Sequence, residues 1–374
     1  MASTKYKLGA LLRLCDERNS DLHYTLEDVK GISIQKVFIE TKADMTGVSL
    51  KPYILVKPDY FAYVTVTSRN GEKITLAHND TENTYIVSSS YVVFEVARTD
   101  ILLSDYLFMY FNRPEFDRYA RFNSWGSARE TFSWEDMCDI DIELPPIEIQ
   151  QKYVDIYNAM LANQRSYERG LTDLKLAIDA GLEQYKHTAK RIPLKELLSE
   201  VDIRNTGTGL TSVYGITMSK EFIPSVANLD GVDLTRYKLV SPGQMACNFM
   251  HVGRDESLPI AINNTEKPLV VSPAYFVFDA KSHICLPEFV VMWLSREESG
   301  RFCWYISDTS VRGSFSLDCF YEIEIPVPNM AEQQYITNIF VAYQLRKEIN
   351  DQLKNQIRDL CPILIIGSVE EASA

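Results

Sequence analysis

The sequence has few of the residues that build disulfide frameworks or zinc sites. It holds seven cysteines and five histidines among 374 residues. The cysteine number is odd, no Cys-x-x-Cys pair occurs, and no two histidines lie at a spacing typical of metal ligands. We therefore expect no disulfide framework and no metal site, and we interpret the cysteines as buried free thiols.

Long apolar runs are also missing. The N-terminus reads Met1-Ala2-Ser3-Thr4-Lys5-Tyr6-Lys7 and lacks the apolar stretch expected of a signal peptide. No segment approaches the roughly 18 apolar residues of a membrane span, and the longest apolar patch near an end is only 362–366. We expect a cytoplasmic protein.

Catalytic signatures are absent as well. The sequence contains no GxxxxGK[ST] loop and no GxSxG elbow. Leu144-Pro145-Pro146-Ile147 superficially resembles the Asn/Asp-Pro-Pro-Tyr/Phe motif of adenine methyltransferases, but it lacks the amide or carboxylate that would hold the amino group. We expect a non-catalytic protein that binds no cofactor of its own.

Positive charge is in short supply. The chain has 51 acidic and 38 basic residues, which gives a net charge of −13. A protein that holds DNA by itself usually has a basic balance. Either DNA is not the ligand, or the basic groups are local and a partner supplies more.

The most informative feature is an internal repeat. Arg129 and the Gln150-Gln151 pair recur 183 positions later as Arg312 and Gln333-Gln334. Upstream, Tyr91 and Phe94 recur 184 positions later as Tyr275 and Phe278. The nearly constant spacing predicts a duplicated domain, with small loop insertions between shared elements.

Each copy begins with a β-rich region. Runs of β-branched and aromatic residues predict strands at 53–56, 63–67, 85–87 and 91–96, and again at 260–262, 269–271 and 275–278. Asn70-Gly71 and Asn263-Asn264 predict turns between strands. Apolar spacing then predicts helices over 105–111 and 287–294.

Each copy ends in a long amphipathic helix. From residue 153 to 178, bulky residues recur at steps of 4 and 3, the spacing of a coiled-coil seam, with the polar Gln164 inside it. The run over 148–185 would extend roughly 57 Å. In the second copy we expect Pro362 to end the helix. We expect the helices to pair antiparallel, the alternative being that each packs on its own domain, through Tyr153, Tyr157, Met160, Tyr167, Leu171, Leu174, Ile178, Ile336, Phe340, Tyr343, Ile349, Leu353 and Ile357.

These patterns predict an α+β protein with two tandem β-rich domains, each followed by a long helix, and with pseudo-twofold symmetry. The expected boundaries are a first domain over 1–146 and its helix over 147–188. A second domain over 189–329, its helix over 330–362 and a flexible tail over 363–374 follow.

Taken together, the motifs resemble the DNA specificity subunit of type I restriction–modification systems. In the first copy they are Gly126-Ser127-Ala128-Arg129, then Pro145-Pro146 and Gln150-Gln151 before the long helix. In the second copy they are Ser310-Val311-Arg312-Gly313, then a broken Pro-Val-Pro and Gln333-Gln334. The resemblance covers nearly the whole chain, although the second copy lacks the first glycine.

The resemblance implies that each domain is a target-recognition domain for one half of a split double-stranded DNA site. It implies that the helices are spacers on which two methyltransferase (modification) subunits dock, and that restriction subunits join that core. S-adenosylmethionine, ATP and magnesium would belong to these partners. A spacer of the expected length could hold two readers about one DNA turn, roughly 34 Å, apart. Because the copies differ outside their shared frame, the two half-sites should differ.

Polar segments between strands provide the candidate DNA contacts. Arg and Asn side chains suit base edges, whereas Lys and Ser suit phosphates. For the two repeated arginines, a structural role that closes the domain is an alternative, and His251 is interpreted as a non-contact. The candidates are Arg69, Asn70, Lys73, Ser127, Arg129, Asn248, Arg254, Ser310 and Arg312.

Two other functions stay open at this point. A specificity subunit that serves a fused methyltransferase–nuclease of a type II-like system would have the same sequence features. A tandem interaction scaffold that does not bind DNA would explain the acidity better, but it leaves the repeated Ser-x-Arg segment and Gln-Gln pair unexplained.

Overall fold

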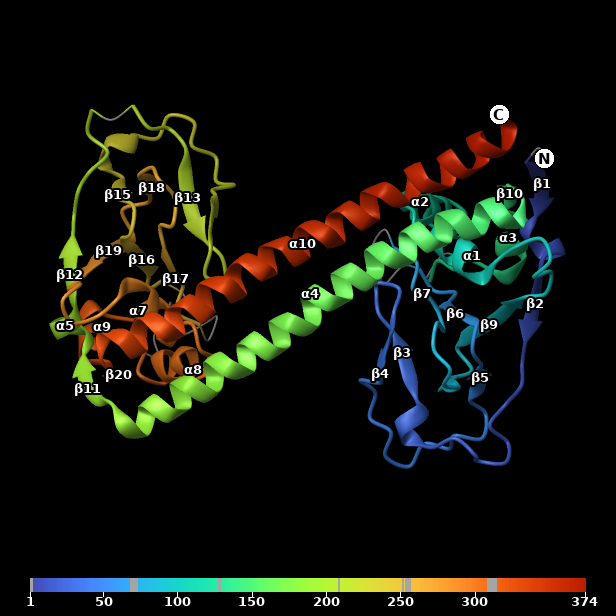
Figure 1. The fold of residues 1–374 in the computed structure, drawn as a ribbon, viewed down its shortest axis with the longest axis horizontal. Helices are drawn as coiled ribbons and strands as arrows, with labels where there is room; N and C mark the ends of the chain where they lie inside the picture. The colour runs from blue at the N-terminus through green and yellow to red at the C-terminus, as the bar shows by residue number, and fades with distance from the viewer. Residues whose placement is uncertain are drawn as a thin grey trace. The chain divides into compact units, whose positions relative to one another are not determined.

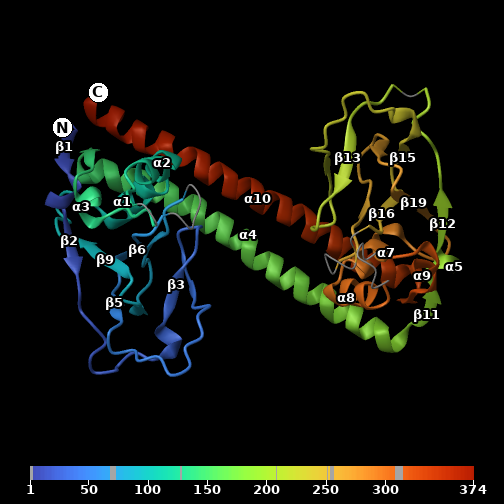
Figure 2. The same ribbon diagram turned by 180° about the vertical axis from the view of Figure 1, so that it is seen from behind.

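A computed structural model of the chain describes residues 3–67, 73–126, 129–207, 209–250, 252, 257–307 and 315–374. The chain forms two compact units (Figures 1 and 2). Unit 1 comprises Met1–Tyr167 and Ile349–Ala374, and unit 2 comprises Glu168–Glu348. Each unit therefore contains a β-rich region and a part of each long helix.

Unit 1 is built around a four-stranded antiparallel sheet. Its strands, in spatial order, are β2 (Leu12–Cys15), β9 (Tyr91–Val96), β6 (Phe61–Val64) and β7 (Leu76–His78). Three strand pairs complete the unit: β1 (Thr4–Lys7) with β10 (Asp141–Leu144), β3 (Lys30–Ile32) with β4 (Phe38–Glu40), and β5 (Ile54–Val56) with β8 (Tyr85–Val87). A parallel bridge between Val29 and Ile86 links the last two pairs.

Unit 2 repeats this topology. One sheet has the order β12 (Leu198–Val201), β19 (Tyr275–Ala280), β16 (Met245–Asn248) and β17 (Ile260–Ile262). The other has β14 (Phe222–Pro224), β13 (Val213–Ile216), β18 (Leu269–Val271) and β15 (Lys238–Val240), and β11 (Lys190–Pro193) pairs with β20 (Glu324–Val327). Val213 pairs with Val270 in parallel, 184 positions after the bridge in unit 1. The predicted duplication is therefore a duplication of fold.

Short helices close one side of the β2-β9-β6-β7 sheet in unit 1 and of the β12-β19-β16-β17 sheet in unit 2. In unit 1 these are α1 (Ser104–Phe111), α2 (Pro114–Phe122) and α3 (Trp134–Cys138). In unit 2 they are α5 (Leu194–Leu197), α7 (Pro287–Leu294), α8 (Glu297–Tyr305) and α9 (Leu317–Glu322). The core of each unit lies between sheet and helices and is rich in phenylalanine, with Phe61, Phe94 and Phe111 fully buried in unit 1.

The predicted α+β class is confirmed, and six of the seven predicted strands lie at or within one or two residues of their predicted positions. The strand predicted over 63–67 instead spans Phe61–Val64. Phe61 pairs with His78 and fills the core, whereas Thr65 and Thr67 hydrogen-bond to residues 130–132. The helices predicted over 105–111 and 287–294 are α1 and α7.

The long helices are α4 (Ile147–Thr188) and α10 (Met330–Ser373). The predicted helix end at Pro362 and the predicted flexible tail over 363–374 are wrong, because α10 continues through Pro362. A proline inside a helix costs about 3 kcal/mol. Packing of the following turns against unit 1 compensates: Ile365, Ser368 and Ala372 are buried, and the Ser368 and Tyr106 hydroxyls lie 2.7 Å apart.

The two long helices run antiparallel within each unit. In unit 1, Tyr153 donates to Glu371 (3.1 Å) and Gln164 donates to Asn350 (2.9 Å). In unit 2, a Cβ on Gly181 would lie 2.8 Å from Ile336. The helices pair with each other and also pack on their own domains, so both predicted arrangements occur. Tyr157 and Ile178 belong to the domain cores as well as to the paired face of α4.

The thirteen predicted pairing residues all lie on the less exposed face of their helix. Tyr157, Ile178, Ile336 and Ile357 are buried, and the other nine are half-buried. Over the ranges given above, no helix is long and apolar enough to cross a membrane.

Candidate nucleic-acid interface

The first glutamine of each Gln-Gln pair fastens a long helix to its domain. Gln150 Nε2 donates to the carbonyl oxygens of Ile101 (2.7 Å) and Pro145 (2.8 Å), and its Oε1 accepts from the Leu103 N–H (3.1 Å). Gln333 makes the same three bonds, to Ile284 (3.0 Å), Pro328 (2.8 Å) and Leu286 (2.9 Å). Both side chains are fully buried. The repeated motif therefore marks a structural joint between α4 or α10 and the segment that starts α1 or α7.

The second glutamine of each pair is exposed and bonds within its own helix. Gln151 Nε2 donates to Asp155 (2.8 Å), and Gln334 Nε2 donates to Asn338 (2.9 Å). Only the first position therefore connects the helix to the rest of the unit.

In unit 1 the structure brings together the described residues that flank the two candidate DNA segments. The Thr67 N–H donates to the Glu130 carbonyl (2.9 Å), and the Phe132 N–H donates to the Thr65 carbonyl (2.8 Å). The chain that enters 68–72 therefore lies beside the chain that follows Arg129. Sequence spacing alone did not predict this contact, because both partners are backbone groups.

Arg129 occupies the turn of a narrow hairpin in which Trp125 pairs with Thr131. Gly126 has a φ of +136°, and a Cβ there would lie 2.2 Å from the Arg129 carbonyl oxygen, so only glycine fits. Arg129 is exposed, and so is Trp125 at 65%. Gly126 thus allows the close approach within this hairpin, and Arg129 lies at the surface. A cationic side chain in this position suits a nucleic-acid contact.

The remaining candidates divide into two groups. Lys73 is exposed next to Ile74, and Asn248 is half-buried, with its Oδ1 accepting from the Met250 N–H (2.9 Å). That bond gives the Asn248 carbonyl a role in the local turn. The other candidates lie outside the described residues: Arg69, Asn70, Ser127, Arg254, Ser310 and Arg312.

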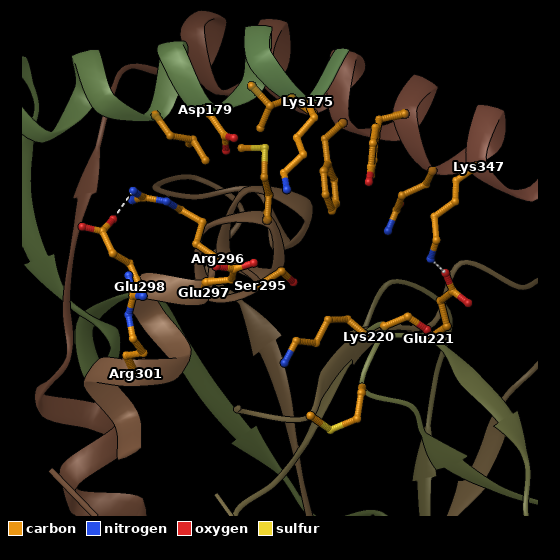
Figure 3. Close-up of a pocket in the computed structure, with 18 residues that line it drawn as sticks. Lys175, Asp179, Lys220, Glu221, Ser295, Arg296, Glu297, Glu298, Arg301 and Lys347 are labelled. Carbon is orange, nitrogen blue, oxygen red and sulfur yellow. Dashed lines mark hydrogen bonds and ion pairs between the residues drawn. The ribbon is translucent and has the colours of Figure 1, made fainter. Parts of the chain in front are cut away.

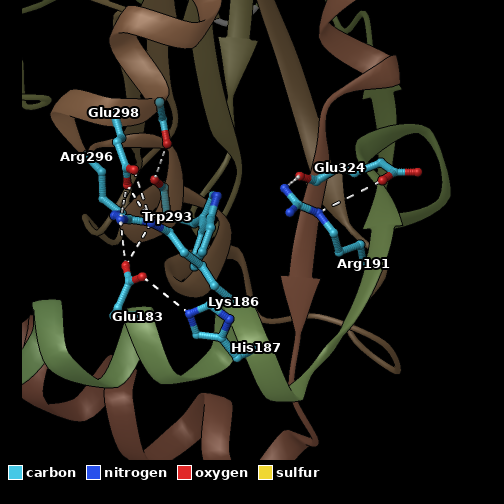
Figure 4. Close-up of polar contacts among 9 residues, drawn as sticks. Glu183, Lys186, His187, Arg191, Trp293, Arg296, Glu298 and Glu324 are labelled. Atoms are coloured by element: carbon cyan, nitrogen blue, oxygen red, sulfur yellow. Dashed lines mark hydrogen bonds and ion pairs between the residues drawn. The ribbon is translucent and has the colours of Figure 1, made fainter.

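A charged network fixes the C-terminal turns of α4 to α8 (Figure 4). Lys186 lies 2.7 Å from Glu183 and 2.9 Å from Glu298, and Arg296 pairs with Glu298. Hydrogen bonds from Lys186 lower the pKa of both carboxyls.

Arg296 also lies over the Trp293 ring at 4.6 Å, as Arg113 lies over Tyr110 in unit 1 at 3.8 Å. The arginine–aromatic pair recurs at a spacing of 183 and is a shared element that the sequence analysis missed.

Unit 2 also contains a cleft of about 500 Å³ between its parts of α4 and α10, the β13–β14 turn and the start of α8 (Figure 3). Its walls carry both signs of charge, including Lys175, Lys220, Arg301 and Asp179. Lys347 of α10 pairs with Glu221 of the turn at 2.9 Å. The cleft is therefore crossed at one edge by an ion pair between helix and hairpin.

Comparison with known proteins gives the family. The family model described as the type I restriction modification DNA specificity domain matches residues 33–172. Residues 33–172 therefore form a domain of the type I restriction modification DNA specificity kind. The match ends shortly after the first segment of unit 1, Met1–Tyr167, and the second copy of the domain follows from the repeated topology and the repeated glutamine joint. Subunits of this family supply DNA sequence specificity and are non-catalytic.

The fold of the whole chain also occurs in a solved structure. The chain is similar to the type I restriction–modification S subunit from M. genitalium, with a TM-score of 0.59 and 12% identity over 100% of this chain and 96% of that chain. The HsdS subunit from Thermoanaerobacter tengcongensis gives a TM-score of 0.37 and 12% identity over 98% and 96% of the two chains. No curated protein sequence matches the chain.

Proposed function

We propose that each unit of this specificity subunit reads one half of a bipartite DNA target, and that the two half-sites differ in sequence. The observation that carries the proposal is that the two units share their backbone framework but differ in the sequence of their candidate DNA-contacting segments. The glutamine joint repeats bond for bond and the strand order repeats, whereas Thr67–Lys73 and its counterpart 251–257 share almost no residues. Because base readout depends on which side chains reach the base edges, a common frame with different segments favours different half-sites.

We further propose that α4 and α10 set the spacing of the half-sites and dock two methyltransferase subunits. Both helices expose apolar side chains away from their paired face: Ile156 (43%) and Leu176 (69%) on α4, and Val341 (49%) and Leu345 (57%) on α10. Val341 and Leu345 lie one helical turn apart, and adjoining exposed apolar side chains favour a protein interface. Restriction subunits would join this core.

In this proposal the partners bind S-adenosylmethionine, ATP and magnesium, and the specificity subunit contributes DNA recognition alone. Its place of action would be the cytoplasm, where the DNA is. Partners of a type II-like fused system would use the same surfaces. Co-purification separates both systems from a scaffold that does not bind DNA: two methyltransferase subunits per chain favour a specificity subunit, and none favours the scaffold.

Methylome sequencing of a host with and without the chain tests the proposal. We expect one methylated motif, made of two different half-sites around a fixed spacer, to disappear with the chain. A palindromic motif, or an unchanged methylome in a host that retains the partner genes, would overturn it.

A further inference from the structure

Two lysines occupy equivalent and unusual positions in the two units. Lys36 ends the β3–β4 turn and Lys220 ends the β13–β14 turn, 184 positions later. Their N–H groups donate to the carbonyls of Ser33 and Thr217, in each case at 3.0 Å. Both residues have left-handed backbone, with φ of 61° and 67°. Glycine or asparagine adopts this conformation at lower cost than lysine does. A lysine in both copies therefore calls for a role of its side chain.

In unit 1 the Lys36 side chain reaches the chain that leaves the candidate DNA segment. Lys36 is 4% exposed, and its Nζ donates to the Phe111 carbonyl (2.5 Å) and lies 2.8 Å from Asp117 Oδ1. The same carboxylate oxygen accepts from the Ile74 N–H at 3.3 Å. Ile74 directly follows Lys73. The lysine thus holds the backbone at the end of 68–73 through one carboxylate.

In unit 2 the equivalent lysine makes the contact directly. Lys220 Nζ donates to Ser257 Oγ (2.5 Å) and to the Leu258 carbonyl (2.6 Å). Leu258 lies 184 positions after Ile74, so the anchored point is the same in both units. Gly300 is the counterpart of Asp117, 183 positions later, and has no carboxylate. In unit 2 the direct bond from Lys220 to the Leu258 carbonyl takes the place of the link through that carboxylate. Burial lowers the pKa of both lysines, consistent with a role inside the unit rather than at its surface.

The hairpin that carries each lysine is itself tied to other parts of its unit. Glu221, next to Lys220, pairs with Lys347 of α10 in unit 2 (Figure 3). In unit 1 Lys36 lies over the ring of Phe116, with its Nζ 5.6 Å from the ring centre. In unit 2 the ion pair therefore ties the hairpin to α10, and in unit 1 the lysine side chain itself packs on a buried ring.

We propose that Lys36 and Lys220 are positioning residues for DNA recognition: each fixes the chain leaving the candidate DNA-contacting segment of its unit without touching DNA. This inference rests on the proposed function. A lysine is normally interpreted as a phosphate contact, but these two direct their charge inward to a carboxylate, a hydroxyl or carbonyl oxygens.

The test uses Lys36→Met and Lys220→Met in the full chain, in a host that carries the partner subunits. Methionine keeps the length and apolar stem but removes the donor. Methylome sequencing gives the ratio of methylation at sites with one mismatched base pair to methylation at the cognate site, for each half-site separately. With the loss of a charged hydrogen bond, we expect that ratio to rise about tenfold in one half for Lys36→Met and in the other half for Lys220→Met.

Each variant is the control for the other. A purely structural role would lower methylation at all sites and leave both ratios unchanged, which would overturn the inference, as would equal changes in both halves. A wild-type chain that yields no split motif would instead overturn the proposed function. If a methionine variant gives no methylation, Asp117→Asn and Ser257→Ala keep the lysine and weaken one contact, and the same half-specific shift is then expected to be smaller. Unchanged ratios in these variants would also contradict the inference.

Discussion

At the residue scale, Gln150 shows how one side chain connects parts of the chain that are about fifty residues apart. Replacing it with leucine leaves the Leu103 N–H and two carbonyls without their buried partner. Each lost bond costs on the order of 1 kcal/mol, so we expect Gln150→Leu to lower the free energy of unfolding of unit 1 by about 3 kcal/mol. Hydrogen exchange followed by mass spectrometry measures the loss in peptides of unit 1 separately from those of unit 2.

The neighbouring glutamine provides a matched control. Gln151 is exposed and bonds only to Asp155 among the contacts seen here, so Gln151→Leu should change the free energy of unfolding by less than about 0.5 kcal/mol. Equal effects of the two substitutions would contradict the role assigned to Gln150. Gln333→Leu should reproduce the large effect in unit 2.

From the sequence, Gln150 could be recognised only as a residue that recurs at the equivalent position of the second copy. Its spacing of 183 showed that the position matters in both copies, but its partners are backbone groups, which have no sequence signature. The same limit applies to Lys36 and Lys220. Their importance follows from a positive φ and from bonds to distant atoms, and neither property can be derived from residue type or spacing.

His78 is the residue for which we expect pH dependence. Its two ring nitrogens are buried without a hydrogen-bond partner among the described residues, and the ring stacks on Phe61 at 4.6 Å. Burial lowers the pKa of His78, although Asp105 at 3.5 Å and Asp59 at 3.7 Å favour the charged form. The folded state then binds fewer protons than the unfolded state. Stability is fully present above the ordinary histidine pKa, about 6.5, and falls as the pH decreases toward the lower folded pKa.

Unit 2 supplies the substitution that tests this dependence, because Ile262 stands 184 positions after His78. We expect His78→Ile to flatten the decline in the free energy of unfolding of unit 1 between about pH 7.5 and pH 5.5. Urea titrations of the wild type and the variant over that range measure the slope. An identical slope in both proteins would show that another group is responsible.

At the element scale, a buried polar contact joins the two paired helices within a largely apolar seam. Gln164 is 7% exposed and Asn350 is 3% exposed, and their amides lie 2.9 Å apart. A buried polar pair of this kind fixes the register of paired helices at some expense of stability. The sequence showed Gln164 inside the seam, but not its partner, because the register of two helices from distant segments has no local signal.

A double-mutant cycle tests this pair. Gln164→Leu alone leaves the Asn350 amide buried beside an apolar group and should lower the free energy of unfolding by about 1–3 kcal/mol. Replacing both residues with leucine should recover most of the lost free energy of unfolding, because no buried polar group is then left without a partner. Urea unfolding of the four proteins gives the coupling energy. A coupling energy near zero would mean that the two amides do not act as a pair.

The end of α10 shows where helix rules derived from the sequence fail. Pro362 lacks an N–H and normally ends a helix. Beyond it, however, Ile365 and Ala372 recur at helical spacing and are buried in unit 1. Tertiary packing therefore decides the outcome. The local preference of Pro362 carries no information about the domain that the following residues contact.

At the scale of the whole molecule, the net charge of −13 has to be reconciled with DNA recognition. Neutralising phosphates requires basic groups, and most of the affinity for DNA comes from them. With 51 acidic and 38 basic residues, the chain has no excess of basic groups for this purpose. We infer that the methyltransferase subunits provide much of the basic surface, and that the specificity subunit contributes discrimination between sequences.

This division of labour predicts how affinity changes on assembly. At physiological salt, the purified chain should bind a duplex of its own target no more tightly than about 10⁻⁶ M, the range of non-specific binding. With its methyltransferase partners, binding should tighten to about 10⁻⁸ M or below. Fluorescence anisotropy with the target duplex and a scrambled duplex measures both states. The slope of log affinity against log salt should also steepen on assembly, because it counts neutralised phosphates. Nanomolar binding by the chain alone, with a steep slope, would show that its own basic groups are sufficient.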